Sequence, residues 1–252
     1  MAEPILQAEA LSKRFGGLAA VSEVALDLRY GEVHAVIGPN GAGKSTLINL
    51  LSGDLAPSAG RIRFDGRDIA GLAADRVARL GIARSYQRTN IFREFTVFEN
   101  CRLAAQARLP TSMRFIRPAL GERALGEAAR GALALVGLEA ASDRAASTLS
   151  HGEQRQLELA MTLATEPKVL LLDEPLAGMG TEESRRMVAL TARLAESHAV
   201  LLVEHDMDAV FSIADRLTVM VNGRVLETGK PAEIRESPAV QEAYLGGAET
   251  TW

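Results

Sequence analysis

Apolar runs separated by turn residues predict short β-strands in the first quarter of the chain. Residues 5–11 and 20–28 have this form, and in the second segment apolar and polar side chains alternate. Residues 33–37 form a compact, mostly apolar run that Gly38 ends, which is typical of a buried strand. Residues 61–66 predict a further strand that runs into a turn.

Helical spacing replaces this pattern in two segments. Residues 46–52 carry leucine and isoleucine at helical spacing, and Gly53 provides a stop signal. From residue 97 to about residue 145 the chain is rich in Ala, Leu, Arg and Glu, which predicts helices that break near Pro110 and Pro118. The second segment therefore has the character of a helical insertion.

Apolar runs return in the second half of the chain. Residues 168–172 and 199–203 have the form of strands that are covered on both faces. Residues 215–221 and 224–227 predict a hairpin around an Asn-Gly turn. Together these elements predict a mostly parallel α/β core that a helical insertion interrupts.

Composition and charge narrow the class of protein. The 252 residues suffice for one large α/β domain, or for a core with a small subdomain. A net charge of −4 and an aromatic content of 4% argue against nucleic acid as the partner. Cys101 is the only cysteine, which excludes an internal disulfide and favours a reducing cytosol. The sequence shows no signal peptide and no apolar run near the ~20 residues of a membrane span, so we expect work at a membrane to depend on partners.

A glycine-rich segment between a predicted strand and a predicted helix fits the phosphate-binding pattern G-x-x-x-x-G-K-[ST]. It reads Gly38-Pro39-Asn40-Gly41-Ala42-Gly43-Lys44-Ser45, and Thr46 follows it. Backbone N–H groups of such a loop surround an anion, and the next helix points its positive end at the phosphates. We expect Lys44 to contact the β- and γ-phosphates of a nucleotide and the Ser45 hydroxyl to hold Mg²⁺. The alternative is a glycine-rich turn that carries Lys-Ser by chance.

Two adjacent acids, Asp173 and Glu174, end the apolar run that begins at residue 168. Open α/β sheets bind ligands at the carboxyl ends of their strands. Asp173 suits Mg²⁺, usually through water, and Glu174 can orient and deprotonate an attacking water. By itself the pair could equally be a solvated strand end, but the glycine-rich loop favours the catalytic interpretation.

A third motif opens a predicted helix. Ser150 and Glu153 have the spacing of a capping box, which marks an ordinary helix start. The other interpretation is an anion site, because the helix N-terminus is free and Gly152 admits the close approach of a phosphate. Taken alone, this motif favours the ordinary helix start.

The glycine-rich loop, the Asp173-Glu174 strand and the Leu149–Glu153 motif before that strand resemble the ATP-binding cassette (ABC) family. The resemblance extends from residue 5 to about residue 245. It implies an α/β fold: a P-loop NTPase (RecA-like) core with an N-terminal antiparallel β subdomain and an inserted α-helical subdomain. The implied boundaries are 1–90 and 160–228 for the core, 91–159 for the helical subdomain with the signature motif, and 229–252 for a C-terminal tail.

The resemblance also implies roles for individual residues. Phe15 resembles the aromatic residue that stacks on adenine. Gln87 resembles the glutamine that joins the Mg²⁺ site to the membrane subunits. Ser150 and Gly152, with Glu153 beside them, resemble the signature that binds the γ-phosphate held by an opposite subunit.

The family has a switch histidine that contacts the γ-phosphate, and three of the four histidines here are candidates for it. His34 lies within a predicted core strand, which favours a buried structural role. His198 precedes a strand, which favours a solvated position. His205 follows residues 199–203, a strand that we expect to end beside the Asp173 strand, so it is the functional candidate. The implied catalytic residues are Lys44, Gln87, Glu174 and His205, and the implied metal ligands are Ser45, Gln87 and Asp173.

Two positions depart from the family pattern, and three segments resemble one branch of it. His151 stands where the signature usually has glycine, and Gly180 stands where the loop after the two acids usually has aspartate. Residues 91–100, 176–180 and 243–246 resemble the ATPase subunits of branched-chain (hydrophobic) amino-acid importers. Urea importers and lipopolysaccharide-exporting ATPases are the similar alternatives.

The resemblance implies ATP and Mg²⁺ as cofactors and a set of protein partners. These are transmembrane permease subunits, a second ATPase subunit (a paralogue or another copy) and, indirectly, a solute-binding protein. The implied location is peripheral, at the cytoplasmic face of the bacterial inner membrane. An ABC ATPase that acts on nucleic acid or ribosomes, and a P-loop kinase or other metabolic enzyme, are the rival classes.

Three phenylalanines cluster just after Gln87, at positions 92, 95 and 98. Aromatic residues are favoured at interface centres, because they bury a large area at little entropic cost. One hypothesis is that at least one of these rings docks against a membrane subunit. The alternative is that the rings only pack the insertion against the core.

Overall fold

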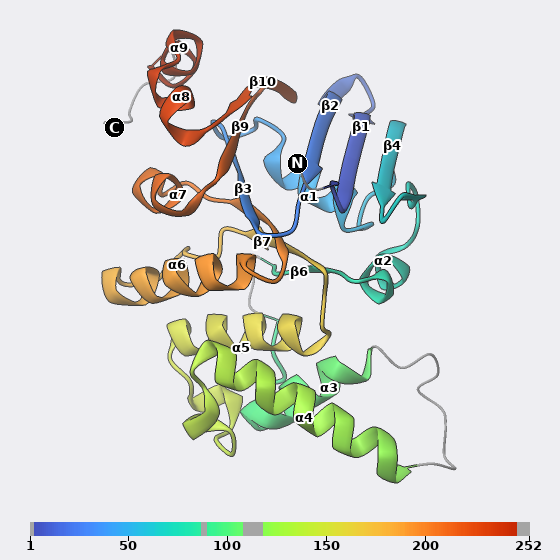
Figure 1. Cartoon of the computed structure of the whole chain (residues 1–252), viewed down its shortest axis with the longest axis vertical. Coiled ribbons are helices and arrows are strands. Elements are labelled where there is room, and N and C mark those ends of the chain that lie inside the picture. The colour runs from blue at the N-terminus through green and yellow to red at the C-terminus, as the bar shows by residue number, and fades with distance from the viewer. Residues whose placement is uncertain (1–2, 87–89, 108–117, 246–252) are drawn as a thin grey trace.

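An antiparallel sheet of four strands lies at the N-terminal side of the molecule, in the order β2-β1-β4-β5 (Figure 1). The computed structural model describes residues 3–86, 90–107 and 118–245. The strands are β1 (Leu6–Phe15), β2 (Leu18–Leu28), β4 (Ala59–Phe64) and β5 (Arg67–Asp68). Buried and exposed positions alternate through much of β2, as the sequence pattern predicts for a sheet with one covered face.

A second sheet of six strands forms the centre, in the order β10-β9-β3-β8-β7-β6. Its strands are β3 (Glu32–Ile37), β6 (Ile82–Arg84), β7 (Val169–Asp173), β8 (Ala199–Val203), β9 (Arg216–Val221) and β10 (Arg224–Gly229). The pairs from β6 to β9 are parallel, and only β10 runs antiparallel to its neighbour. Every residue of β7 and β8 is buried, which accounts for their continuous apolar sequences.

Helices cover this sheet and extend below it. They are α1 (Lys44–Leu51), α2 (Ala74–Leu80), α3 (Val97–Gln106), α4 (Pro118–Val136), α5 (His151–Ala164), α6 (Thr181–Ala195), α7 (Met207–Ile213), α8 (Pro231–Glu236) and α9 (Pro238–Leu245). Two short 3₁₀ helices, Glu139–Ala141 and Ala146–Thr148, precede α5. In Figure 1, α3, α4 and α5 lie together at the opposite end of the molecule from α8 and α9. Within the described ranges, no helix combines the length and the hydropathy needed to span a membrane.

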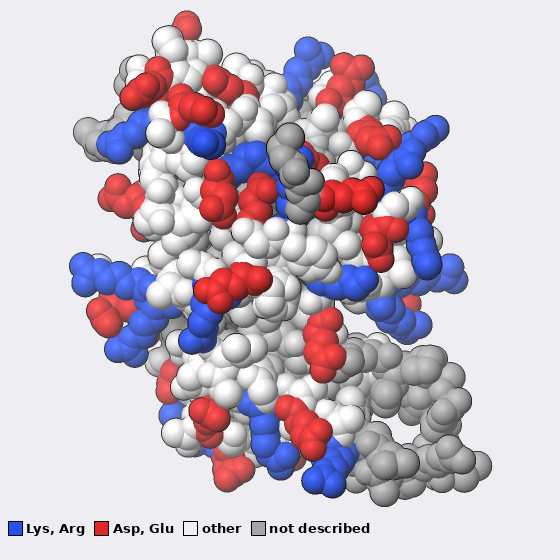
Figure 2. Space-filling view, viewed as in Figure 1, with Lys and Arg blue, Asp and Glu red and all other residues white. Residues whose placement is uncertain are grey.

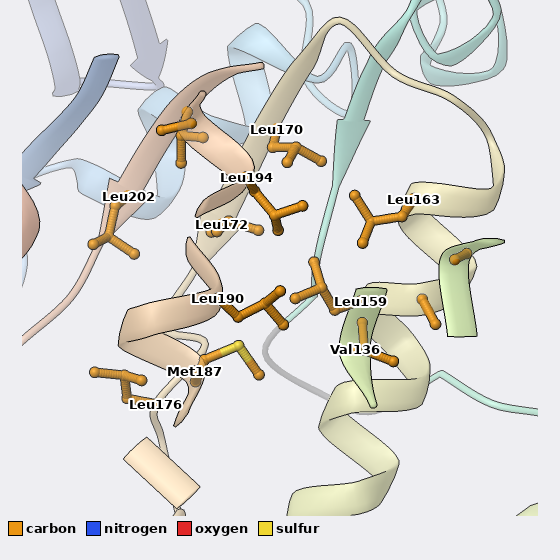
Figure 3. Packing of buried hydrophobic residues seen from close by; sticks show 14 of the residues in the cluster. Val136, Leu159, Leu163, Leu170, Leu172, Leu176, Met187, Leu190, Leu194 and Leu202 are labelled. Atoms are coloured by element: carbon orange, nitrogen blue, oxygen red, sulfur yellow. The ribbon is translucent and has the colours of Figure 1, made fainter. Parts of the chain in front are cut away.

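The two faces of the central sheet pack into two apolar clusters. Leu170 and Leu172 belong to the cluster that contains α5 and α6, whereas Val169 and Leu171 belong to the cluster with α1 and the antiparallel sheet. Figure 3 shows leucines of α5 and α6 gathered against β7. A fully buried leucine contributes about 1.5–3 kcal/mol. The leucines of α5 therefore anchor this helix to the core.

The fold class predicted from the sequence is confirmed, and several elements are refined. The strand at residues 199–203 has the predicted bounds, and the predicted hairpin is β9–β10. The pattern missed β6 and α2, which contain three and seven residues and are too short for a clear period. The range predicted as a C-terminal tail contains α8 and α9, and Ile234 and Val240 bury their side chains in the core. The subdomain boundaries stay predictions.

Candidate functional site

The glycine-rich loop connects β3 to α1, as predicted. Two of its glycines are required by close contacts: a Cβ on Gly38 would lie 2.1 Å from the Met220 carbonyl oxygen, and one on Gly43 would lie 2.4 Å from that of Ala20. Both residues have positive φ, 153° and 101°, which side chains disfavour. The loop is therefore pressed against β9 and β2, so that its backbone can line a cleft.

Lys44 begins α1 and is buried. Its Nζ atom donates to the carbonyl oxygens of Gly38, at 2.6 Å, and Pro39, at 3.1 Å. Burial lowers the pKa of Lys44, and the carboxylates of Glu174 and Asp173 oppose this effect. The ammonium group thus lies among the loop carbonyls, with two acidic side chains near it.

A cleft of about 440 Å³ opens over this loop. It is lined by Leu18, Ala19 and Ala20 of β2, by residues 40–46, by Glu174 and His205, and by Asn222 and Gly223 of the β9–β10 turn. The cleft brings Lys44 and Ser45 together with the predicted base and the predicted switch histidine. The cleft offers the backbone N–H groups of the loop, the N-terminus of α1 and the Lys44 ammonium group. These groups are suited to bind a chain of phosphates.

Asp173 ends β7 beside this cleft, and its side chain is only 1% exposed. Arg84 Nη2 lies 2.9 Å from Asp173 Oδ2, and the backbone N–H of Asp173 donates to Ser85 Oγ at 3.2 Å. The other oxygen, Oδ1, is buried and has no hydrogen-bond partner among the described residues. Burial raises the pKa of Asp173, and the Arg84 guanidinium opposes that rise.

Glu174 and His205 form a direct pair across the ends of β7 and β8. His205 Nε2 lies 2.5 Å from Glu174 Oε1, and the backbone N–H of Glu174 donates to the Val203 carbonyl at 2.8 Å. Glu174 has a φ of 51°, in the left-handed region that a non-glycine residue enters at a cost. This backbone conformation turns Glu174 out of the strand direction and into the cleft, where it lies beside His205.

A buried carboxylate organises the loops behind this pair. Glu204 accepts a hydrogen bond from the backbone N–H of Leu176 at 2.7 Å and another from that of His205 at 3.0 Å. Burial raises the pKa of Glu204, and these two N–H groups oppose the rise. Glu204 therefore ties the segment after Glu174 to the segment that carries His205, and the sequence motifs did not identify it.

The signature residues lie at the N-terminus of α5, outside the cleft that contains Lys44. The capping box predicted from Ser150 and Glu153 is present, since Ser150 Oγ accepts from the Glu153 backbone N–H and the Glu153 carboxylate accepts from that of Ser150. Gly152 is buried, and a Cβ there would lie 2.3 Å from Glu183 Oε1. A single chain thus does not bring Ser150 and Gly152 to its own phosphate loop.

The remaining predicted residues have different outcomes. Phe15 ends β1 with an exposed ring, outside the lining of the Lys44 cleft. Gln87 lies outside the described residues. His34 is a satisfied core residue as predicted, with Nε2 2.7 Å from Thr218 Oγ1, and burial lowers its pKa to about 4. His198 is half-buried rather than solvated, and its Nδ1 lies 2.8 Å from the Leu194 carbonyl oxygen.

Two further parts of the site were missed by the sequence motifs. Arg84 contacts Asp173, although the two residues are far apart in sequence. Asn222 and Gly223 line the cleft, although their sequence predicted only a hairpin turn. An Asn-Gly pair predicts the turn but does not indicate that the turn lines a ligand site. Arg84 lies on a strand of three residues, which is too short to give a sequence pattern, so nothing in the sequence indicated its contact with Asp173.

Comparisons with known proteins agree with this geometry. The family model described as ABC transporter matches residues 21–177, and the model described as branched-chain amino acid ATP-binding cassette transporter matches residues 224–250. Two curated relatives are high-affinity branched-chain amino acid transport ATP-binding proteins: LivG of Salmonella typhimurium, 42% identical, and BraF of Pseudomonas aeruginosa, 43% identical. Each alignment covers 98% of this chain and 100% of the relative.

Solved structures give the same result. The crystal structure of the ADP conformation of an ATP-binding cassette of an ABC transporter is 30% identical, with a TM-score of 0.85. That similarity covers 97% of this chain and 100% of the other. The chain therefore belongs to the ABC transporter family, as one of its ATP-hydrolysing cassettes.

Proposed function

We propose that this chain hydrolyses ATP to drive a membrane importer of branched-chain or other hydrophobic amino acids, or of related small solutes. One observation carries the ATPase part of the proposal: Lys44, Ser45, Glu174 and His205 line one cleft around the glycine-rich loop. The solute class is supported by the names of the relatives and by the family model matched at residues 224–250.

In this proposal the phosphates lie on the loop, where backbone N–H groups and Lys44 compensate their charge. Asp173 Oδ1, which has no hydrogen-bond partner within the described part of the chain, and the Ser45 hydroxyl are oxygen donors of the kind that Mg²⁺ prefers. Mg²⁺ is usually held by one or two carboxylates together with substrate phosphates, so the small number of acidic side chains here suffices. When bound, Mg²⁺ would neutralise charge that develops on the phosphates.

Glu174 is the proposed general base. Its carboxylate takes a proton from a water molecule as the water oxygen attacks the γ-phosphorus, and the bond to the β-phosphate oxygen breaks. The His205 imidazole lies against Glu174 Oε1 and holds the carboxylate in place within the cleft. The products are ADP and inorganic phosphate.

A complete site is proposed to need a second ATPase subunit. Ser150 and Gly152 stand at a helix N-terminus outside their own cleft, so in a head-to-tail pair they could contact the γ-phosphate on the partner. Phe15 is proposed to stack on adenine, and Gln87 to join the metal site to the permease. The proposed boundaries of the helical subdomain, 91–159, contain the signature.

The proposed location is the cytoplasmic face of the bacterial inner membrane, where permease subunits hold the chain and a solute-binding protein delivers cargo. Urea and lipopolysaccharide transporters remain the alternative systems for the same ATPase chemistry. For an ABC ATPase that acts on nucleic acid we would expect a continuous basic surface, whereas Figure 2 shows basic and acidic side chains interspersed over the face in view.

The test is ATP hydrolysis by the purified chain, with and without reconstituted permease subunits and a solute-loaded binding protein. We expect basal hydrolysis that the assembled system stimulates, together with uptake of a branched-chain amino acid into vesicles. Stimulation by nucleic acid or ribosomes in place of the permease would instead favour an ABC ATPase that acts on nucleic acid or ribosomes. Phosphate transfer from ATP to a small acceptor would favour a P-loop kinase or other metabolic enzyme.

A further inference from the structure

Arg84 bridges three parts of the structure around the proposed metal site. It is the last residue of β6, and its guanidinium group forks between two acids. Nη2 lies 2.9 Å from Asp173 Oδ2, and Nη1 lies 2.8 Å from Asp54 Oδ2. Nη1 also donates to Asn49 Oδ1, on the helix that begins with Lys44. The strand that ends in Asp173 is thereby connected to the helix that follows the phosphate loop.

Arg84 and Asp173 are both buried, which strengthens the contact between them. The side chain of Arg84 is 10% exposed, and the ring of Tyr86 covers the guanidinium, with its centroid 4.9 Å from Cζ. Charge-assisted hydrogen bonds in such a site are shorter and stronger than bonds between neutral groups. A planar guanidinium with two partners at fixed angles holds a carboxylate in one rotation, which a lysine ammonium does not do.

The contact with Arg84 uses only one oxygen of Asp173. Oδ2 accepts from Arg84, whereas Oδ1 is buried without a hydrogen-bond partner among the described residues. A buried oxygen left in this way is uncommon and calls for a ligand, a water molecule or an ion. Arg84 thus occupies one carboxylate oxygen of Asp173 and leaves the other available.

We propose that Arg84 is a positioning residue for the Mg·ATP site. It holds Asp173 Oδ2 so that Oδ1 faces the metal side, and it fixes this carboxylate relative to the helix that carries Ser45. The inference rests on the proposed role of Asp173 at the metal. Groups that orient a metal-site carboxylate in this way typically change metal affinity about 10–100-fold when they are removed.

The experiment measures binding and needs no turnover. Mn²⁺ replaces Mg²⁺ as an EPR-visible probe, and its affinity is measured for the full chain saturated with a non-hydrolysable ATP analogue. Arg84→Gln is expected to weaken Mn²⁺ binding about 10–100-fold. Binding of the same analogue in EDTA is expected to change by no more than about twofold, because Arg84 does not line the phosphate cleft.

Matched variants separate positioning from folding. Asp54→Asn removes the charge at the other arm of the guanidinium but keeps an acceptor oxygen for Nη1 and leaves the contact with Asp173, so Mn²⁺ affinity is expected to stay within about twofold. Arg84→Lys keeps the positive charge and one donor for Asp173, and is expected to give an intermediate affinity. Thermal unfolding of each variant shows whether the chain is folded. If Arg84→Gln does not fold, Arg84→Lys takes its place in the Mn²⁺-binding test.

The outcomes are distinct. Weaker Mn²⁺ binding in Arg84→Gln with intact metal-free nucleotide binding supports the inference. Unchanged affinity overturns it, and so does tighter binding, which is expected if the guanidinium merely competes with the metal for Asp173. Asp173→Asn is the benchmark for the proposed role of Asp173. If Asp173→Asn binds Mn²⁺ normally, the proposed role of Asp173 at the metal is wrong. If Asp173→Asn binds Mn²⁺ weakly but Arg84→Gln binds it normally, the role of Asp173 stands and the positioning role of Arg84 is rejected.

Discussion

Glu158 is a buried carboxylate whose charge should cost stability at neutral pH, and Glu158→Gln tests this. Its side chain is 8% exposed, in a cleft beside Tyr86 that is separate from the phosphate loop. The backbone N–H of Tyr86 donates to Oε1 at 3.1 Å, and Arg155 Nη1 lies 3.9 Å from Oε2. Burial raises the pKa of Glu158 to about 6, against the opposing effects of the Tyr86 N–H and of Arg155.

The magnitude follows from proton linkage. The pKa moves from its ordinary value of 4.5 to about 6 in the folded chain, and each pKa unit corresponds to about 1.4 kcal/mol. Between these two pH values the folded chain binds more protons than the unfolded chain, so the contribution of Glu158 to the free energy of unfolding falls as pH rises. At pH 7 the charged side chain therefore costs about 2 kcal/mol relative to its protonated form.

The assay is urea unfolding at several pH values from 4.5 to 7.5, with circular dichroism as the measure of the folded fraction. Glutamine keeps the acceptor for the Tyr86 N–H and cannot ionise, so the variant should gain about 2 kcal/mol on the wild type across this range. Glu127→Gln is the matched control, because that side chain is 65% exposed on α4. A difference between Glu158→Gln and wild type that is flat with pH, or that shrinks as pH rises, would refute the reasoning.

Three further outcomes are expected. Lys44→Ala should lose most affinity for Mg·ATP in calorimetry, since it removes the cation placed at the phosphate loop, and unchanged affinity would reject the assignment of the loop. Glu174→Gln should bind ATP and hydrolyse it about 10²–10⁴-fold more slowly, with an ATP-held dimer detectable by size-exclusion chromatography; near-normal turnover would place the base elsewhere. Phe92 and Phe95 are 51% and 42% exposed, with their ring centroids 5.4 Å apart, so alanine at either position should leave basal hydrolysis intact and impair assembly with the permease. A large fall in melting temperature in both variants would instead favour the packing role.

The third phenylalanine has a different environment. Phe98 is partly buried against the apolar core, and the Arg130 guanidinium lies 5.2 Å from its ring centroid. The packing interpretation therefore accounts for Phe98, and the docking hypothesis rests on the other two rings. The sequence spacing alone could not make this distinction, because burial depends on where α4 lies.

Contiguous features of the sequence determined much of the site. The phosphate loop, the acids at the end of β7 and the capping box at Ser150 each lie within a few residues, so local pattern and backbone preference suffice to recognise them. The strands β7 and β8 were predictable because each is a run of five buried residues. The prediction that they end side by side is confirmed, with Asp173 opposite Val203.

Only the tertiary structure decided how these features act together. The contacts between Arg84 and Asp173, between Glu174 and His205, and between Gly152 and Glu183 join residues from different elements. Each depends on the order of the strands in the sheet and on which helix end lies beside which loop. Side-chain periodicity reports only which face of an element is buried, so contacts between distant segments leave no local signal. Short elements such as β6 leave none either, and their positions are fixed by their neighbours in the folded core.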